Sequence, residues 1–179
     1  MRQSTVYTRT AVALHWLIAL LIGAGFTLGA NMTDLHMSPR KLRLYSYHKW
    51  IGITVLGLVL IRVLWRLTHR PPPDEPMPSW QRHAAHLTHG LLYALMICTP
   101  VVGWLYSSAT GYPVVYLKLW QLPDLVPKND ALAKMLVIVH GSLAWTLLAV
   151  VALHAAAALK HHYVDRDATL RRILSWRAS

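Results

Sequence analysis

Two histidines lie 14 residues apart inside one long apolar stretch of the sequence. Residues 137–163 read VIVHGSLAWTLLAVVALHAAAALKHHY, in which His140 and His154 interrupt a run made mostly of valine, isoleucine, leucine and alanine. Fourteen residues are close to four helical turns, so the two imidazoles lie on one helix face, about 21 Å apart along the axis. Ionisable side chains are costly in such surroundings, so this pair needs partners on neighbouring helices or in a cofactor.

Four apolar segments of the chain are long enough to cross a bilayer, which takes about 20 residues. They span residues 11–30, 47–67, 87–108 and 134–158. Hydrophobic residues make up 55% of the chain and charged residues only 14%, a balance that disfavours a soluble protein. The sequence therefore predicts an all-α integral membrane protein, a four-helix bundle that forms a single transmembrane domain over residues 1–179.

The connections between these segments differ in character. The second and third segments are joined by RPPPDEPMPSWQRH (70–83), whose prolines predict a non-helical loop. The third and fourth are joined by TGYPVVYLKLWQLPDLVPKND (110–130), which predicts an interfacial loop or a short helix lying on the membrane. The single cysteine, Cys98, lies in an apolar run and is expected to be a small core residue.

The distribution of lysine and arginine predicts the orientation of the bundle. Eleven lie on the side of the two termini and the proline-rich loop, namely Arg2, Arg9, Arg62, Arg66, Arg70, Arg82, Lys160, Arg166, Arg171, Arg172 and Arg177. Seven lie on the opposite side, namely Arg40, Lys41, Arg43, Lys49, Lys118, Lys128 and Lys134. Since cytoplasmic loops carry the excess of positive charge, both termini are expected in the cytoplasm.

Four histidines lie within or at the ends of these segments, and their depths form two pairs. With both termini inside, His15 and His154 lie in the inner half of the bilayer, whereas His48 and His140 lie in the outer half. A haem with two axial histidines needs one nitrogen on each face of a flat macrocycle, and facing helices of a bundle supply them. The pairs His15/His154 and His48/His140 therefore predict two haems stacked across the bilayer.

A small residue follows each of these histidines by four positions, where it shares the helix face and leaves room for a porphyrin edge. These residues are Ala19, Gly52, Ala144 and Ala158. The alternative to haem ligation is hydrogen bonding between the helices. A zinc site is disfavoured, because zinc takes four clustered ligands rather than two distant pairs.

Arg62 lies 14 residues after His48 and so on the same face of the second segment. An arginine this deep in a bilayer either pairs with an anion or extends its side chain to the lipid headgroups. The first alternative predicts a bidentate, charge-assisted contact with a propionate of the inner haem. The second predicts a guanidinium at the cytoplasmic surface.

Four stretches of the chain together carry a family resemblance. They are ALHWLIALL around His15, HKWIGITVLGLVLIRVLWRL from His48, HLTHGLLYALMICTPVVGW from His86, and LHAAAALKHHYVDRDATLRRI around His154. In these stretches the chain resembles the bacterial cytochrome b561 family, four-helix di-haem b proteins of the inner membrane, and within it the superoxide oxidases. The resemblance implies haem ligation by His15, His48, His140 and His154, transfer of electrons from superoxide to ubiquinone, and an inner-membrane location. The chain also resembles, more distantly, the haem-carrying membrane subunits of hydrogenases and formate dehydrogenases.

The electron donor and the electron acceptor at the two ends of such a haem pair determine the reaction. The excess of basic residues on the outer side, opposed by Asp34, Asp124 and Asp130, would steer a small anion such as superoxide toward the outer haem. The alternative is ordinary solvated charge or attraction to anionic lipid. No nucleotide-binding glycine motif occurs in the chain, so the acceptor is expected to be lipid-soluble, as ubiquinone is.

Quinone reduction consumes protons, so proton donors are expected near one haem. Four histidines fall near the cytoplasmic face, His86, His89, His161 and His162, which favours a quinone pocket by the inner haem. The net charge of +11 would suggest nucleic acid in a soluble protein, but here the basic residues lie between apolar runs, so no nucleic-acid partner is expected.

Two functions of different class follow. One is an enzyme, a superoxide:ubiquinone oxidoreductase with two haem b groups. The other is a haem-bearing subunit that relays electrons between the quinone pool and a separate periplasmic redox partner, docked on the loop that contains Tyr116 and Trp120. A transporter is disfavoured, because the segments show neither inverted repeats nor paired broken helices.

Overall fold

The computed structural model describes residues 6–69 and 71–174. Within them, four long helices are each long and apolar enough to cross a membrane. They are α1 (Arg9–Thr33), α2 (Pro39–Thr68), α3 (Ser79–Ala109) and α4 (Asp130–Lys160). The prediction of an all-α membrane bundle is confirmed. Arg2, Arg70 and Arg177, which enter the orientation count, lie outside the described residues.

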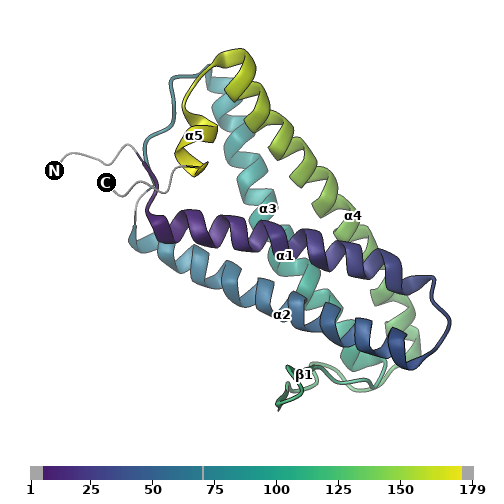
Figure 1. The fold of residues 1–179 in the computed structure, drawn as a ribbon. Helices are drawn as coiled ribbons and strands as arrows, with labels where there is room; N and C mark the ends of the chain where they lie inside the picture. The colour runs from purple at the N-terminus through teal and green to yellow at the C-terminus, as the bar shows by residue number, and fades with distance from the viewer. Residues whose placement is uncertain (1–5, 70, 175–179) are drawn as a thin grey trace.

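The four helices form two antiparallel hairpins, α1 with α2 and α3 with α4, and α2 packs against α3 (Figure 1). Polar side chains cap the starts of three of the long helices; at α4 the side-chain oxygen of Asn129 accepts from the backbone N–H of Leu132. The hydroxyl oxygen of Thr8 accepts from the backbone N–H of Ala11, and that of Ser38 accepts from the N–H of Lys41. Such caps satisfy backbone donors that the helix itself leaves unpaired, which matters most where a helix starts near apolar surroundings.

The helices extend beyond the predicted apolar segments. α3 begins at Ser79, so the prediction that residues 70–83 form a non-helical loop is wrong for residues 79–83. The reason is that every proline of this loop precedes the helix: Pro78 occupies the cap position, where the missing N–H costs nothing. This early start places His89 almost three turns inside α3 rather than at the edge of a span.

The connection between α3 and α4 forms a small β-hairpin, and the short helix considered for it is absent from these residues. Strand β1 (Val115–Tyr116) pairs antiparallel with β2 (Trp120–Gln121). The indole N–H of Trp50 donates to the carbonyl oxygen of Val115 at 2.7 Å, which holds the hairpin against α2.

The C-terminal part of the described chain folds back at the other end of the bundle (Figure 1). α4 continues into a π-helical turn, η1 (His161–Asp165), which ends at Arg166 in a left-handed conformation with φ of 55°. The short helix α5 (Thr169–Leu174) follows, and the indole N–H of Trp16 donates to the carbonyl oxygen of Ile173 at 3.0 Å.

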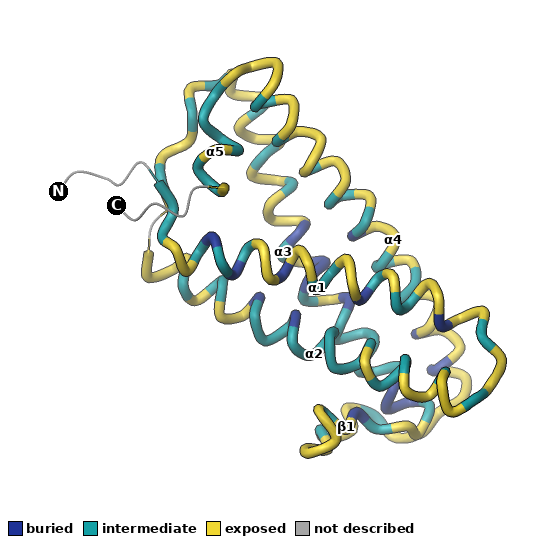
Figure 2. The backbone as a smooth tube through the Cα atoms, viewed as in Figure 1, coloured by how far each residue is buried: buried dark blue, intermediate teal, exposed yellow. Residues whose placement is uncertain are grey.

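All four long helices contribute to one apolar core. It consists of Ile18, Val55, Val59, Leu92, Leu95, Met96 and Leu147. Many outward-facing residues are also apolar and exposed, as the yellow segments of Figure 2 show for the helices; Leu20 is 70% and Ile138 is 69% exposed. An apolar exterior of this kind suits lipid rather than water. Cys98 is exposed too, so its prediction as a core residue is wrong.

Candidate functional site

The four histidines expected to bind haem meet in two pairs. The ring centres of His48 on α2 and His140 on α4 are 6.0 Å apart, and those of His15 on α1 and His154 on α4 are 6.3 Å apart. Two imidazoles that bind one metal ion from opposite sides have ring centres about 6 Å apart, since each metal–nitrogen bond is about 2 Å long and each ring centre lies about 1 Å beyond its nitrogen. Both pairs therefore have the spacing that a shared metal ion requires.

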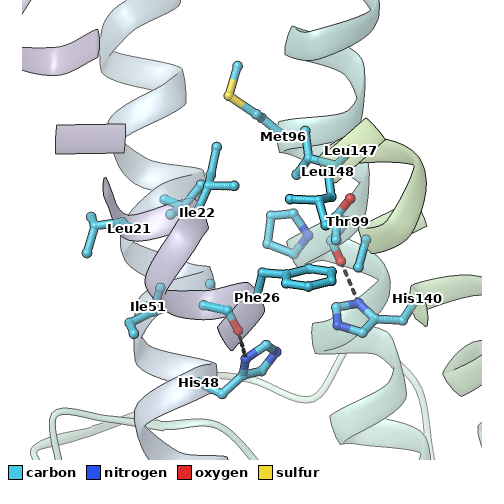
Figure 3. A pocket seen from close by; sticks show the side chains of 15 residues that line it. Leu21, Ile22, Phe26, His48, Ile51, Met96, Thr99, His140, Leu147 and Leu148 are labelled. Carbon is cyan, nitrogen blue, oxygen red and sulfur yellow. Dashed lines mark hydrogen bonds between the residues drawn. The ribbon is translucent and has the colours of Figure 1, made fainter. Parts of the chain in front are cut away.

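Backbone carbonyls fix both rings of the outer pair. The Nδ1–H of His48 donates to the carbonyl oxygen of Gly25 at 2.9 Å, and the Nδ1–H of His140 donates to that of Thr99 at 3.0 Å (Figure 3). A carbonyl oxygen can only accept, so the proton must lie on Nδ1 and the lone pair on Nε2. Metal-binding histidines are typically held in this way, with the second nitrogen free for the metal.

Two glycines that sequence reasoning missed leave room for the outer rings. A Cβ atom added at Gly103 would lie 2.9 Å from Cε1 of His140, and one at Gly29 would lie 3.2 Å from Cε1 of His48. The first distance is shorter than real Cβ contacts allow, so an alanine there would displace the imidazole. The available sequence signal was the cost of a glycine within a helix, about 1 kcal/mol relative to alanine, which calls for a packing reason.

The outer pair lines a cavity of about 530 Å³. This is within the range of small-molecule and cofactor sites. Gly52 and Ala144, two of the small residues expected to make room for a porphyrin, lie in its wall. A second, adjoining cavity shares these histidines and is walled mostly by apolar side chains such as Leu21, which Figure 3 shows. The donor atoms, the space and the apolar surroundings fit a haem held by His48 and His140.

The inner pair has polar neighbours. Nη1 of Arg62 donates to the carbonyl oxygen of Ala11 at 2.8 Å, and its Nε donates to the hydroxyl of Tyr93 at 3.1 Å. Nη2 of Arg62 lies 3.4 Å from Nδ1 of His15, a long contact for a hydrogen bond. Among the described residues no carboxylate pairs with this guanidinium, so its charge is unneutralised in the membrane segment.

The histidines expected to supply protons fall in three different places. The ring centre of His89 lies 5.3 Å from that of His154, so His89 belongs to the inner site. His86 is exposed and contacts Asp74, with 3.1 Å between Nε2 and Oδ2. His161 lies next to the carboxylates of Asp165 and Asp167, and Nδ1 of His162 is buried without a partner among the described residues.

Asp167 lies in the C-terminal turn, outside the membrane-spanning segments, and its carboxylate accepts two hydrogen bonds within this turn. The Nδ1–H of His161 donates to its carboxylate at 2.7 Å, and the backbone N–H of Thr169 donates to it at 2.8 Å. Burial raises the pKa of Asp167, but these hydrogen bonds from Thr169 and His161 outweigh it, so the pKa lies below its ordinary value. The ionised carboxylate therefore stabilises this turn.

The apolar core lies between the two histidine pairs. On α2 it includes Val55 and Val59, between His48 and Arg62, and on α4 it includes Leu147, midway between His140 and His154. The two sites are therefore about 21 Å apart along α4, at two depths of the bundle, with closely packed side chains between them.

Seven basic side chains belong to the end of the bundle that is expected to face outward, and one of them reaches the cavity of His48 and His140. Lys49 lines this cavity together with Asp34 and Tyr45, and its Nζ donates to the carbonyl oxygen of Tyr112 at 2.8 Å. Of the other six basic residues expected at the outer side, Lys41 is half-buried, and Arg40, Arg43, Lys118, Lys128 and Lys134 are exposed.

Imidazole pairs at two depths of an apolar membrane bundle are the arrangement of a membrane electron-transfer cytochrome. Sequence comparison leads to the same class: the chain belongs to the prokaryotic cytochrome b561 family, whose profile matches residues 6–176. The chain is therefore a transmembrane electron-transfer protein, and membership of the family implies haem b.

Two relatives illustrate the range of this family. The chain is 34% identical over 178 residues to cytochrome b561 homolog 2 of Escherichia coli, covering 94% of this chain and 90% of the relative. It is 32% identical over 177 residues to the probable superoxide oxidase CybB of Yersinia pestis, covering 94% of this chain and 95% of the relative.

Proposed function

We propose that the chain carries two haem b groups and passes electrons from superoxide at the periplasmic side to ubiquinone in the bacterial inner membrane, with both termini in the cytoplasm. The observation that supports this most directly is the pairing of four imidazoles at two depths, each pair at the spacing of a shared metal ion. Similarity to a probable superoxide oxidase over nearly the whole chain supports the choice of substrate.

In this proposal His48 and His140 hold the outer haem, and His15 and His154 hold the inner one. Haem b supplies reversible one-electron chemistry when bound. The carbonyls of Gly25 and Thr99 keep Nε2 of the outer histidines available for the iron. Arg62 offers an unneutralised guanidinium to a propionate, a charge-assisted contact.

The reaction balances without a catalytic base. Each superoxide loses one electron and leaves as oxygen, so two superoxide ions reduce one ubiquinone, which also takes up two protons. The basic outer side chains attract the anion, and Lys49 brings positive charge to the cavity that His48 and His140 line. His89 beside His154, and His161 and His162 after α4, are the proposed sources of protons for the quinone.

A superoxide pulse on the purified protein, with ubiquinone present, tests the proposal. The haem absorption bands should show rapid reduction and then reoxidation as ubiquinol forms, and added superoxide dismutase should abolish both. Lys49→Gln should lower the rate of reduction about two- to tenfold at low salt and less at high salt. Lys134→Gln, whose side chain is exposed and lies outside the cavity wall, is the matched control.

The relay function is the second candidate, and the β-hairpin favours it. Leu119 is 87% and Trp120 is 75% exposed at the outer end, as an anchor for a periplasmic partner would be. A normal two-haem spectrum that superoxide leaves unchanged would support the relay and exclude the oxidase.

A further inference from the structure

The inner site holds three imidazoles, whereas the outer site holds two. His89 enters from α3, and its ring centre is 5.3 Å from that of His154, closer than His15 at 6.3 Å. Around His48 and His140, the only imidazole contact among the described residues is the one between these two rings. The third ring is therefore a specific feature of the inner site.

The ring of His15 is held less firmly than the rings of the outer pair. Its only hydrogen-bonding neighbour among the described residues is Nη2 of Arg62 at 3.4 Å. His48 and His140 each donate to a backbone carbonyl at 2.9 to 3.0 Å. A ligand without such an anchor keeps its ring orientation less strictly and is easier to replace.

No hydrogen bond holds the ring of His89 within the described part of the chain. This residue is exposed. It nevertheless lies almost three turns inside α3, a membrane-spanning helix, where an unpartnered imidazole is costly. A histidine at such a position, next to another imidazole, is suited to bind a metal rather than to support packing.

We infer that His89 is a reserve axial ligand of the inner haem iron, which binds opposite His154 when His15 is absent or displaced. This inference rests on the proposed ligation of the inner haem by His15 and His154. The 5.3 Å between the ring centres of His89 and His154 is less than 1 Å short of the roughly 6 Å that a shared metal requires, and side-chain rotation covers such a difference. The exchange replaces one iron–nitrogen bond by another and changes no oxidation state.

The full-length protein with single and double substitutions provides the test. Haem per chain and the ferric spin state, from absorption and electron paramagnetic resonance spectra, are the readouts. We expect His15→Ala to keep two low-spin haems, and His15→Ala/His89→Ala to have a high-spin inner haem or only one haem per chain. Exogenous imidazole should restore the low-spin signal wherever the haem is retained.

A matched control is His15→Ala/His83→Ala. His83 lies on the same helix and is exposed, with Nδ1 2.7 Å from the carbonyl oxygen of Ser79, so this variant should resemble His15→Ala alone. In every variant, a normal low-spin signal of the outer haem shows that the chain has folded. If His15→Ala alone loses the inner low-spin signal as fully as the double variant, the reserve role is wrong. If the wild-type protein lacks two low-spin haems, the proposed function itself fails instead.

Discussion

The outer and inner histidine pairs have nearly the same spacing but are built in different ways. At the outer pair, two backbone carbonyls and two close-packed glycines determine where the rings lie. At the inner pair, the guanidinium of Arg62, which itself donates to a tyrosine hydroxyl, lies beside His15, and a third imidazole lies beside His154. Packing and backbone carbonyls thus determine the ring positions of the outer pair, whereas a charge and a third imidazole distinguish the inner pair.

This difference suits the direction of the proposed reaction. A cation such as Arg62 stabilises the electron-rich state of a nearby redox centre, here by offsetting the negative charge of a propionate, and so raises its affinity for an electron. At the outer pair the cation Lys49 shares the cavity wall with the carboxylate of Asp34, so its positive charge is opposed there. Electrons entering at the outer site are therefore expected to move toward the inner one, where a quinone can be reduced.

The largest effect is expected from removing the histidines themselves. His48→Ala or His140→Ala should remove the outer haem and leave the inner one, because no third imidazole contacts these rings among the described residues. His154→Ala should remove the inner haem alone, since His15 and His89 both lie next to His154 and would both lose it as a partner. Haem per chain should fall from two to about one in each case, as measured by the pyridine haemochrome assay.

Selective loss in the wrong combination, for example loss of the inner haem in His140→Ala, would contradict the assigned pairs. Equal loss of both haems from all three variants would show that the two sites fold as one unit, linked by the apolar core to which all four long helices contribute.

The histidine pairs could be predicted from the sequence because helical spacing converts directly into depth. His140 and His154 must lie on one face about 21 Å apart, and the order of the helices then fixes which histidine each can meet. The carbonyl partners of the outer pair could not be predicted, since every residue carries a carbonyl and only the packing of α1 and α3 selects those of Gly25 and Thr99.

The place of His89 was missed for a different reason. Hydropathy locates the apolar segment from residue 87, whereas the helix begins at Ser79, so the sequence placed His89 at an interface instead of beside His154. A helix start depends on caps and on the position of proline, which hydropathy does not register.

The next largest effect is expected from filling the space beside an outer ring. Gly103→Ala would place a methyl group 2.9 Å from Cε1 of His140 and should displace this imidazole, lowering occupancy of the outer haem and altering its spectrum. Gly29→Ala, at 3.2 Å from His48, should act in the same direction but less strongly.

Gly57→Ala is the control for this comparison, because a Cβ there meets nothing within 4 Å and Gly57 lies outside the walls of both cavities at the outer pair. It should leave both haem spectra unchanged. An unaltered outer haem in Gly103→Ala would mean that the ring has room to shift and that packing does not fix this site.

A smaller effect is expected from removing the charge at the inner site. Arg62→Leu should lower the midpoint potential of the inner haem by an amount corresponding to on the order of 1 to 2 kcal/mol, and leave the outer potential nearly unchanged. Arg66→Leu, one turn further along α2 and exposed, should cause a smaller shift. Redox titration of the two haems distinguishes these outcomes, and an equal shift of both potentials would show a general effect of the protein charge.

The smallest effect is expected where the C-terminal turn closes the inner end. Because the pKa of Asp167 is lowered in the folded turn, its stabilising effect is present above the ordinary carboxyl pKa and is lost as the pH falls through the lowered value. Asp167→Ala should speed hydrogen exchange of the Thr169 amide about tenfold at neutral pH, as loss of a helix cap does, whereas Asp165→Ala should change it less.

In the wild-type protein this amide should stay protected down to about pH 4 and lose protection only below it, after correction for the intrinsic exchange rate. Trp16 connects the turn to the inner site. Its ring centre lies 5.2 Å from that of His15, and its indole N–H donates to the carbonyl oxygen of Ile173. Acidification could remove the protection of the turn and change the spectrum of the inner haem but not that of the outer haem. This result would show that the inner site responds to its surroundings and the outer site does not. If both spectra stay constant, the turn is separate from the haem sites and the inner pair depends on the helices alone.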